Sequence, residues 1–156
     1  NSAIAAGRIN MDIAGSEAIG PITAFLVFDM ADQLGTIVNA RIRLNGRLYG
    51  DSEDDNETLV VYEVSTAIET LRAQGSPAEV IDDLSSGTEL GTATIAPSEN
   101  EQDSVVLIEL NEDGLTLLNG SESQVAFGLF LTSAAENENS YFGTQNAAEL
   151  VIGGYP

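Results

Sequence analysis

A short acidic stretch, residues 51–57, has the residue types of a calcium site. Carboxylate oxygens suit Ca²⁺, and five carboxylates within seven residues would repel one another unless a cation lies among them. The first acids alternate as in the first half of an EF-hand loop, but the sixth position is Asn56 rather than Gly, and the twelfth is Tyr62 rather than Glu. A Ca²⁺ site and a solvated acidic loop therefore both stay open. The candidate ligands are Asp51, Glu53, Asp54, Asp55 and Glu57.

The residue types that most enzymes need are missing. The chain has no His, no Cys and no Lys. This removes the usual general base, the thiol nucleophile and the amine that forms Schiff bases, and it makes a Ser–His–Asp triad impossible. Carboxylate pairs that could hydrolyse a glycoside remain, but 25 acidic residues will form such pairs by chance. We therefore predict that the protein is not an enzyme.

Two further groups could bind a partner. A polysaccharide site needs a flat aromatic face, and Tyr49 and Tyr141 are the candidates, the alternative being that they are core or rim residues. Arg41 and Arg43 alternate along one predicted strand, and Arg47 follows closely. These arginines either neutralise the acidic surface locally or form a basic stripe that docks the acidic face of another copy.

The composition restricts the partners and the location. All five basic residues are Arg, and the net charge is −20 over 156 residues. Such a charge argues against nucleic acid and against an anionic membrane surface, and no run approaches the roughly 18–20 apolar residues of a membrane span. High acid content without Lys is typical of proteins in salt water, where ions screen the repulsion. We expect a mature chain, after removal of a signal peptide, that is extracellular or on the cell surface.

The apolar pattern predicts many short strands. Residues 22–30 and 104–110 are nearly continuous apolar runs, which indicate buried strands. Asn45-Gly46 is typical of a hairpin turn. Thr66 with Glu69 predicts a capping box at the start of a short helix, and Asn111 predicts the cap of another. The expected fold is all-β: a single domain over residues 1–156, an antiparallel β-sandwich (jelly-roll-like) with one or two short helices in connections.

The order of the segments resembles a known class of secreted module. The segments that carry the resemblance are FLVFDM at 25–30, LGTIVNARIRL at 34–44, VVYEVS at 60–65, DLSSG at 83–87, VLIELN at 106–111, AFGLFL at 126–131, YFG at 141–143 and ELVI at 149–152. Together they are similar to the jelly-roll modules of prokaryotic surface proteins, including the DNRLRE-type modules related to carbohydrate-binding domains. The resemblance covers residues 8–152 and implies an extracellular β-sandwich that serves as an adhesin, a glycan binder or a filament part. Unlike glycan-binding relatives, this chain has no Trp.

These features lead to two functional hypotheses. The first is an extracellular structural protein that self-assembles as a subunit of a surface filament or matrix, with the chain itself as its partner. The second is a glycan-binding adhesin module of a secreted protein. For the first, residues 1–7 are an N-terminal extension or donor strand, which is held either by a neighbouring subunit or by the chain's own sandwich. The apolar residues that would fill a neighbour's slots are Ile4, Ile9, Met11 and Ile13.

Overall fold

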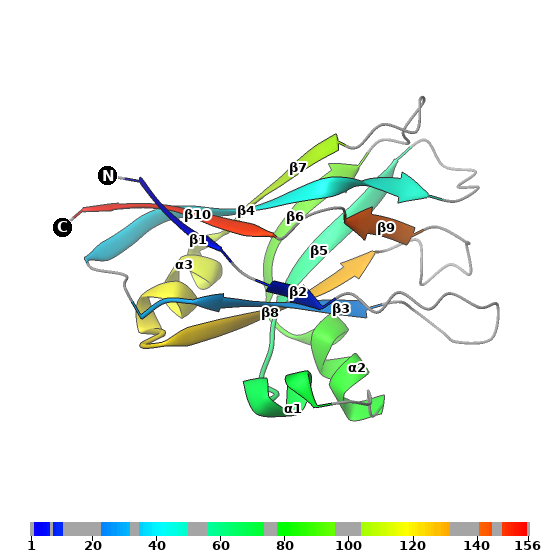
Figure 1. Cartoon of the computed structure of the whole chain (residues 1–156), viewed down its shortest axis with the longest axis horizontal. Coiled ribbons are helices and arrows are strands. Elements are labelled where there is room, and N and C mark those ends of the chain that lie inside the picture. The colour runs from blue at the N-terminus through cyan, green and yellow to red at the C-terminus, as the bar shows by residue number, and fades with distance from the viewer. Residues whose placement is uncertain are drawn as a thin grey trace.

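The computed structural model consists mainly of antiparallel strands in two stacked sheets (Figure 1). It describes residues 2–6, 8–10, 23–31, 35–49, 56–73, 78–95, 104–131, 141–144 and 148–155. The predicted antiparallel β-sandwich is therefore confirmed.

Each sheet contains five described strands. Sheet A has the order β1 (Ser2–Ala6), β10 (Glu149–Tyr155), β4 (Thr36–Tyr49) and β7 (Ser104–Glu109), and β9 (Tyr141–Thr144) pairs with the far end of β4. Sheet B has the order β2 (Arg8–Asn10), β3 (Thr23–Asp29), β8 (Gln124–Leu131), β5 (Glu57–Glu63) and β6 (Glu89–Ile95).

The strand order is that of a jelly roll. When the short strands β2 and β9 are set aside and the other eight are renumbered along the chain, sheet A reads 1-8-3-6 and sheet B reads 2-7-4-5. The N-terminal segment passes from one sheet to the other, since β1 lies at the edge of sheet A and β2 at the edge of sheet B. The first strand of the roll is thus an edge strand that pairs with the last strand, β10.

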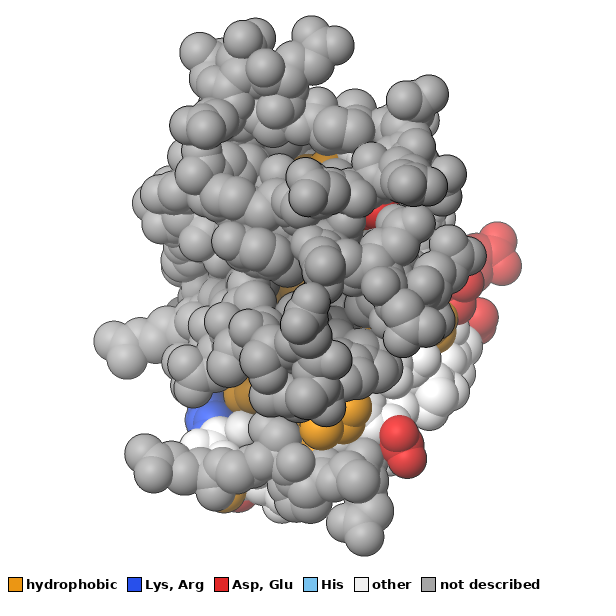
Figure 2. All heavy atoms as spheres, turned by 90° about the vertical axis from the view of Figure 1, so that its right-hand side faces the viewer, with side chains coloured by type: hydrophobic (Ala, Val, Ile, Leu, Met, Phe, Trp, Pro, Cys, Tyr) orange, Lys and Arg blue, Asp and Glu red, His pale blue; other side chains and the backbone are white. Residues whose placement is uncertain are grey.

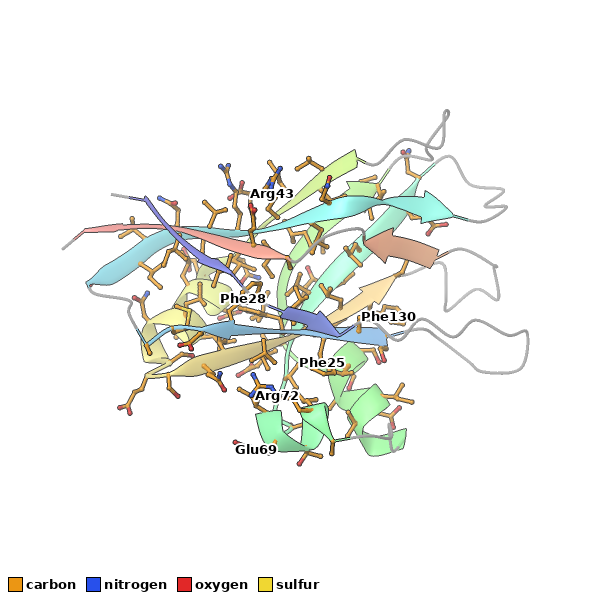
Figure 3. All side chains as sticks on the ribbon, viewed as in Figure 1. Phe25, Phe28, Arg43, Glu69, Arg72 and Phe130 are labelled. Atoms are coloured by element: carbon orange, nitrogen blue, oxygen red, sulfur yellow. The ribbon has the colours of Figure 1, made fainter. Side chains whose placement is uncertain are left out.

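Strand β3 is buried on both faces over residues 26–28, as its apolar run predicts. Leu26 and Phe28 belong to the core between the sheets, where Phe28 meets Phe127 edge to face with ring centroids 5.9 Å apart. Val27 belongs instead to a smaller cluster on the outer face of sheet B. Phe28 and Phe25 extend from opposite faces of the strand (Figure 3). A residue run without polar alternation is what such two-sided burial requires.

Two short helices, α1 (Ile68–Arg72) and α2 (Ala78–Ser86), cover the outer face of sheet B. Strand and helix approach each other closely at Gly128, where an added Cβ would lie 2.3 Å from the carbonyl oxygen of Leu84. The predicted capping box is wrong: the N-cap is Ala67, with no side-chain cap hydrogen bond. The Thr66 hydroxyl donates instead to Asp83 of α2, at 2.6 Å.

The third helix, α3 (Glu112–Gly120), closes one end of the sandwich (Figure 1). The predicted cap is confirmed, because Asn111 Oδ1 accepts a hydrogen bond from Gly114 N–H at 3.0 Å. At the other end of the helix, Asn119 bonds to the backbone of Ile37 at the start of β4. Between these ends, Leu118 is fully buried in the main core.

Two expectations about the connections need correction. The predicted hairpin at Asn45-Gly46 is wrong, because β4 runs without a break from Thr36 to Tyr49. Pairing with β7 on one edge and with β10 and then β9 on the other holds this segment extended, so tertiary pairing overrides the local turn preference. The described residues also contain three short helices rather than one or two.

Candidate functional site

The outer face of sheet A carries two of the three arginines of the predicted stripe, Arg41 and Arg43. Arg41 Nη1 lies 3.6 Å from Glu109 on β7, and Arg43 Nη1 donates to Glu149 Oε2 on β10 at 2.8 Å. Arg43 extends outward from the sheet, away from the core (Figure 3). Both guanidinium groups thus have an acidic partner in their own chain, as in the local-neutralisation interpretation. Arg47 lies opposite Gly143 in the register of β4 and β9.

The same face carries exposed apolar side chains, and the sequence interpretation assigned those of β7 to the interior. Residues 104–110 were expected to form a buried strand, but only alternate side chains are buried: Val106, Ile108 and Leu110. Val105 and Leu107 are 50% and 43% exposed, and Val38 on β4 is 44% exposed. An unbroken apolar run does not distinguish two-sided burial from an exposed apolar face, so these residues were missed as a candidate surface.

The N-terminal segment lies on the chain's own sandwich. In the register of β1 and β10, Ile4 is opposite Val151, while Ala3 and Ala5 are opposite the buried residues Ile152 and Leu150. Ile9 is opposite Leu26 in the register of β2 and β3. Met11 and Ile13 lie outside the described residues.

One carboxylate of the predicted calcium site is buried. Glu57, the first residue of β5, is 3% exposed, and its Oε1 has no hydrogen-bond partner among the described residues. A charged group in such a place is costly unless a counter-charge accompanies it. Asp51, Glu53, Asp54 and Asp55 lie outside the described residues. Among the residues that the structure describes, no three acidic side chains gather as a metal-binding group.

The two candidate glycan-binding tyrosines are paired by the sheet. Tyr49 at the end of β4 lies directly opposite Tyr141 at the start of β9. Figure 2 shows the end of the sandwich that lies on the right-hand side of Figure 1, where several acidic side chains lie along the right border and a basic area lies at the lower left.

One hydrogen-bonded carboxylate stands out electrostatically, away from the predicted sites. Asp83 accepts hydrogen bonds from the backbone N–H and hydroxyl groups of both Ser65 and Thr66, at 2.6–3.3 Å. Burial alone would raise the pKa of Asp83, but these hydrogen bonds together hold its pKa below the usual Asp value. Because the bonds join α2 to the segment before α1, this role is structural.

Comparison with models of known protein families gives no match, and comparison with curated proteins gives none either. None of the described helices has the length and apolar character needed to cross a membrane.

Proposed function

We propose that the chain is an extracellular, non-catalytic structural protein that assembles with copies of itself into a surface filament or matrix. The observation that supports this most is the position of β1: it is the first strand of the jelly roll, it lies at a sheet edge, and it pairs with β10. A jelly roll without β1 would leave the edge of β10 open to the first strand of another chain.

The same pairing can be made within one chain or between two. The register of β1 with β10 joins residues 2–6 to residues 149–153, and the register of β2 with β3 joins residues 8–10 to residues 25–27. A neighbour's N-terminal segment would make these same contacts, so exchange costs little beyond the entropy of association. Backbone hydrogen bonds supply most of the affinity in such strand addition. Each subunit that gives its segment to one neighbour and receives one from another extends a polymer.

The charge of the chain fits this mode of contact. Residues 1–10 carry one charged side chain, Arg8, whereas the whole chain has a net charge of −20. A nearly uncharged segment can approach an acidic neighbour with little repulsion. Salt screens the remaining repulsion between subunits, so assembly through strand pairing should persist at high ionic strength.

The test is deletion of residues 1–7, followed by sedimentation and electron microscopy. We expect the full chain to form ordered polymers and the shortened chain to fail. A matched pair, Ala5→Asp and Ile4→Asp, adds the same charge at adjacent positions. Ala5→Asp should inhibit assembly more, because Ala5 lies opposite the buried Leu150. Polymers that form equally well without residues 1–7 would exclude exchange, and a strictly monomeric full chain would exclude a self-assembling subunit.

The register of Tyr49 with Tyr141 supports a second candidate, a glycan-binding adhesin module. Two adjacent tyrosines can offer an aromatic platform to a sugar ring. Under this alternative the chain stays monomeric and binds a polysaccharide. Tyr49→Ala should then abolish retention on the polysaccharide column that retains the wild-type chain, and retention unchanged in both Tyr49→Ala and Tyr141→Ala would exclude this site.

A further inference from the structure

We infer that β7 is a second self-association surface, which pairs antiparallel with β7 of another copy about a two-fold axis at Val106. This strand lies at the edge of sheet A opposite to β1. The contact goes beyond the proposed strand exchange and does not depend on it.

The backbone of β7 is open at two positions in the described part of the chain. Leu110 N–H donates to Ala40 O at 2.9 Å, and hydrogen-bonded pairs alternate along an antiparallel ladder. The backbone groups of Val106 and Ile108 therefore face β4, and those of Val105 and Leu107 face away from it. Edge strands with such open groups readily accept another strand.

Strand β6 covers the far end of this edge and limits the open part. Asn111 N–H donates to Leu90 O at 2.8 Å, and a Cβ added at Gly91 would lie 2.5 Å from Glu109 O. The stretch available to a partner is therefore residues 104–108. Within this stretch, the backbone groups of Val105 and Leu107 face away from β4. The side chains of the same two residues are the exposed apolar ones of the strand.

A two-fold axis at Val106 makes this short strand complementary to itself. Val105 of each copy then lies opposite Leu107 of the other, and each such pair exchanges two backbone hydrogen bonds. Opposite residues project from the same face of a sheet, so the two valines and two leucines form one apolar cluster across the junction. An axis at Leu107 would instead place Val105 opposite Glu109.

The charge distribution favours a second copy as the partner at this edge. Residues 104–108 are uncharged in a chain of net charge −20. Two such chains repel each other over most of their surface, and the repulsion is smallest where uncharged strands meet. On the neighbouring strand β4, Arg41 and Arg43 further reduce the negative charge around the junction. Salt should therefore strengthen this contact.

The first experiment tests the register with single cysteines, because the chain has none of its own. Full-length Val105→Cys and Leu107→Cys chains are oxidised mildly, alone and as a mixture. Opposite residues in a hydrogen-bonded pair have Cα atoms about 5.5 Å apart, which suits a disulfide. We expect a disulfide-linked dimer in the mixture and not in either variant alone. Equal cross-linking in all three samples, or none in any, would overturn the inference.

The second experiment measures affinity by sedimentation equilibrium at high salt. Leu107→Lys places a charge in the apolar cluster and should raise the dimer dissociation constant at least about tenfold. Val38→Lys is the matched control. Val38 is about as exposed as Leu107, and its substitution changes the net charge equally, but it lies on β4. A Leu107→Lys chain that associates as tightly as the Val38→Lys chain would overturn the inference. Strand exchange is judged separately, by the deletion of residues 1–7, so the two proposals can fail independently.

Discussion

The side chain of Asn119 bonds to Ile37 as a neighbouring strand would. Its Oδ1 accepts from Ile37 N–H and its Nδ2 donates to Ile37 O, both at 2.9 Å, across 82 residues of sequence. β7 ends before it reaches this part of β4, and the helix α3 supplies the missing partner through one amide. Because the N–H and carbonyl groups of Ile37 are both hydrogen-bonded, β4 can begin here, at the edge of the core.

Asn119→Asp should destabilise the fold. The substitution replaces the Nδ2 donor with an oxygen, so the carbonyl groups of Ile37 and Leu115 each lose a partner. We expect the free energy of unfolding to fall by about 1–3 kcal/mol, measured by urea denaturation. Asn39→Asp, at an exposed position on β4, adds the same charge and should change the free energy of unfolding less. Equal losses in both variants would show that added charge, not the lost donor, is responsible.

Acid should loosen the α1–α2 pair. The folded pKa of Asp83 lies below its unfolded value, so its carboxylate contributes stability that is complete above about pH 4 and is lost as the pH falls through the lower folded pKa. Near neutral pH, Asp83→Asn should lower the free energy of unfolding below that of the wild type by about 1–3 kcal/mol. The difference between the two chains should shrink on acidification.

Unfolding curves from pH 7 to pH 2 would check this, with the exposed neighbour Asp82→Asn as control. A difference between wild type and Asp83→Asn that stays constant with pH would contradict the assigned role.

Gly128→Ala should separate α2 from sheet B. The added Cβ would lie 2.3 Å from Leu84 O, a backbone atom that cannot move without shifting the helix. We expect a loss of about 1–3 kcal/mol, as for other overpacked sites. Gly120→Ala is the control, because a Cβ at Gly120 meets nothing within 4 Å. Thermal melts of the two variants should differ clearly, and similar melting temperatures would contradict the close approach.

Glu57 offers a direct test of calcium binding. If this buried carboxylate is a ligand, Ca²⁺ should raise the melting temperature by mass action, and Glu57→Gln should remove most of that shift. The same variant should be more stable than wild type without Ca²⁺, because it buries no charge. Glu63→Gln, at the other end of β5, is the matched control. Asp51→Asn with Asp55→Asn tests the rest of the stretch, and an unchanged shift in all variants would place any site elsewhere.

The sequence predicts the sandwich well where burial is expressed in the local pattern. The unbroken apolar run around Phe28 correctly indicates a strand buried on both faces. Its residues alternate between the core and the smaller cluster under α1 and α2. No described element covers the outer face of the similar run around Leu107. The residues of that run alone do not predict this exposure. Only the fold decides what covers a strand.

Local turn and cap signals failed where distant partners were stronger. Asn45-Gly46 stays extended because strands lie on both edges of β4. Thr66 does not cap α1, because its hydroxyl donates to Asp83 of α2. Arg41 and Arg43 share one face as expected, and their glutamate partners come from strands far away in the sequence, at Glu109 and Glu149. The calcium, glycan and assembly roles stay predictions.

The pairing of the first strand with the last sets an order for folding during synthesis. Ser2 lies opposite Gly153, and Ala6 lies opposite Glu149, so β1 is synthesised long before the strand that it pairs with. Sheet A cannot gain this pairing before β10 has been synthesised, and contacts so distant in sequence form slowly. During that interval β1 of a nascent copy has not yet met the strand that it pairs with in the fold. The waiting time for β10 is therefore the window in which a neighbouring copy can accept the strand instead.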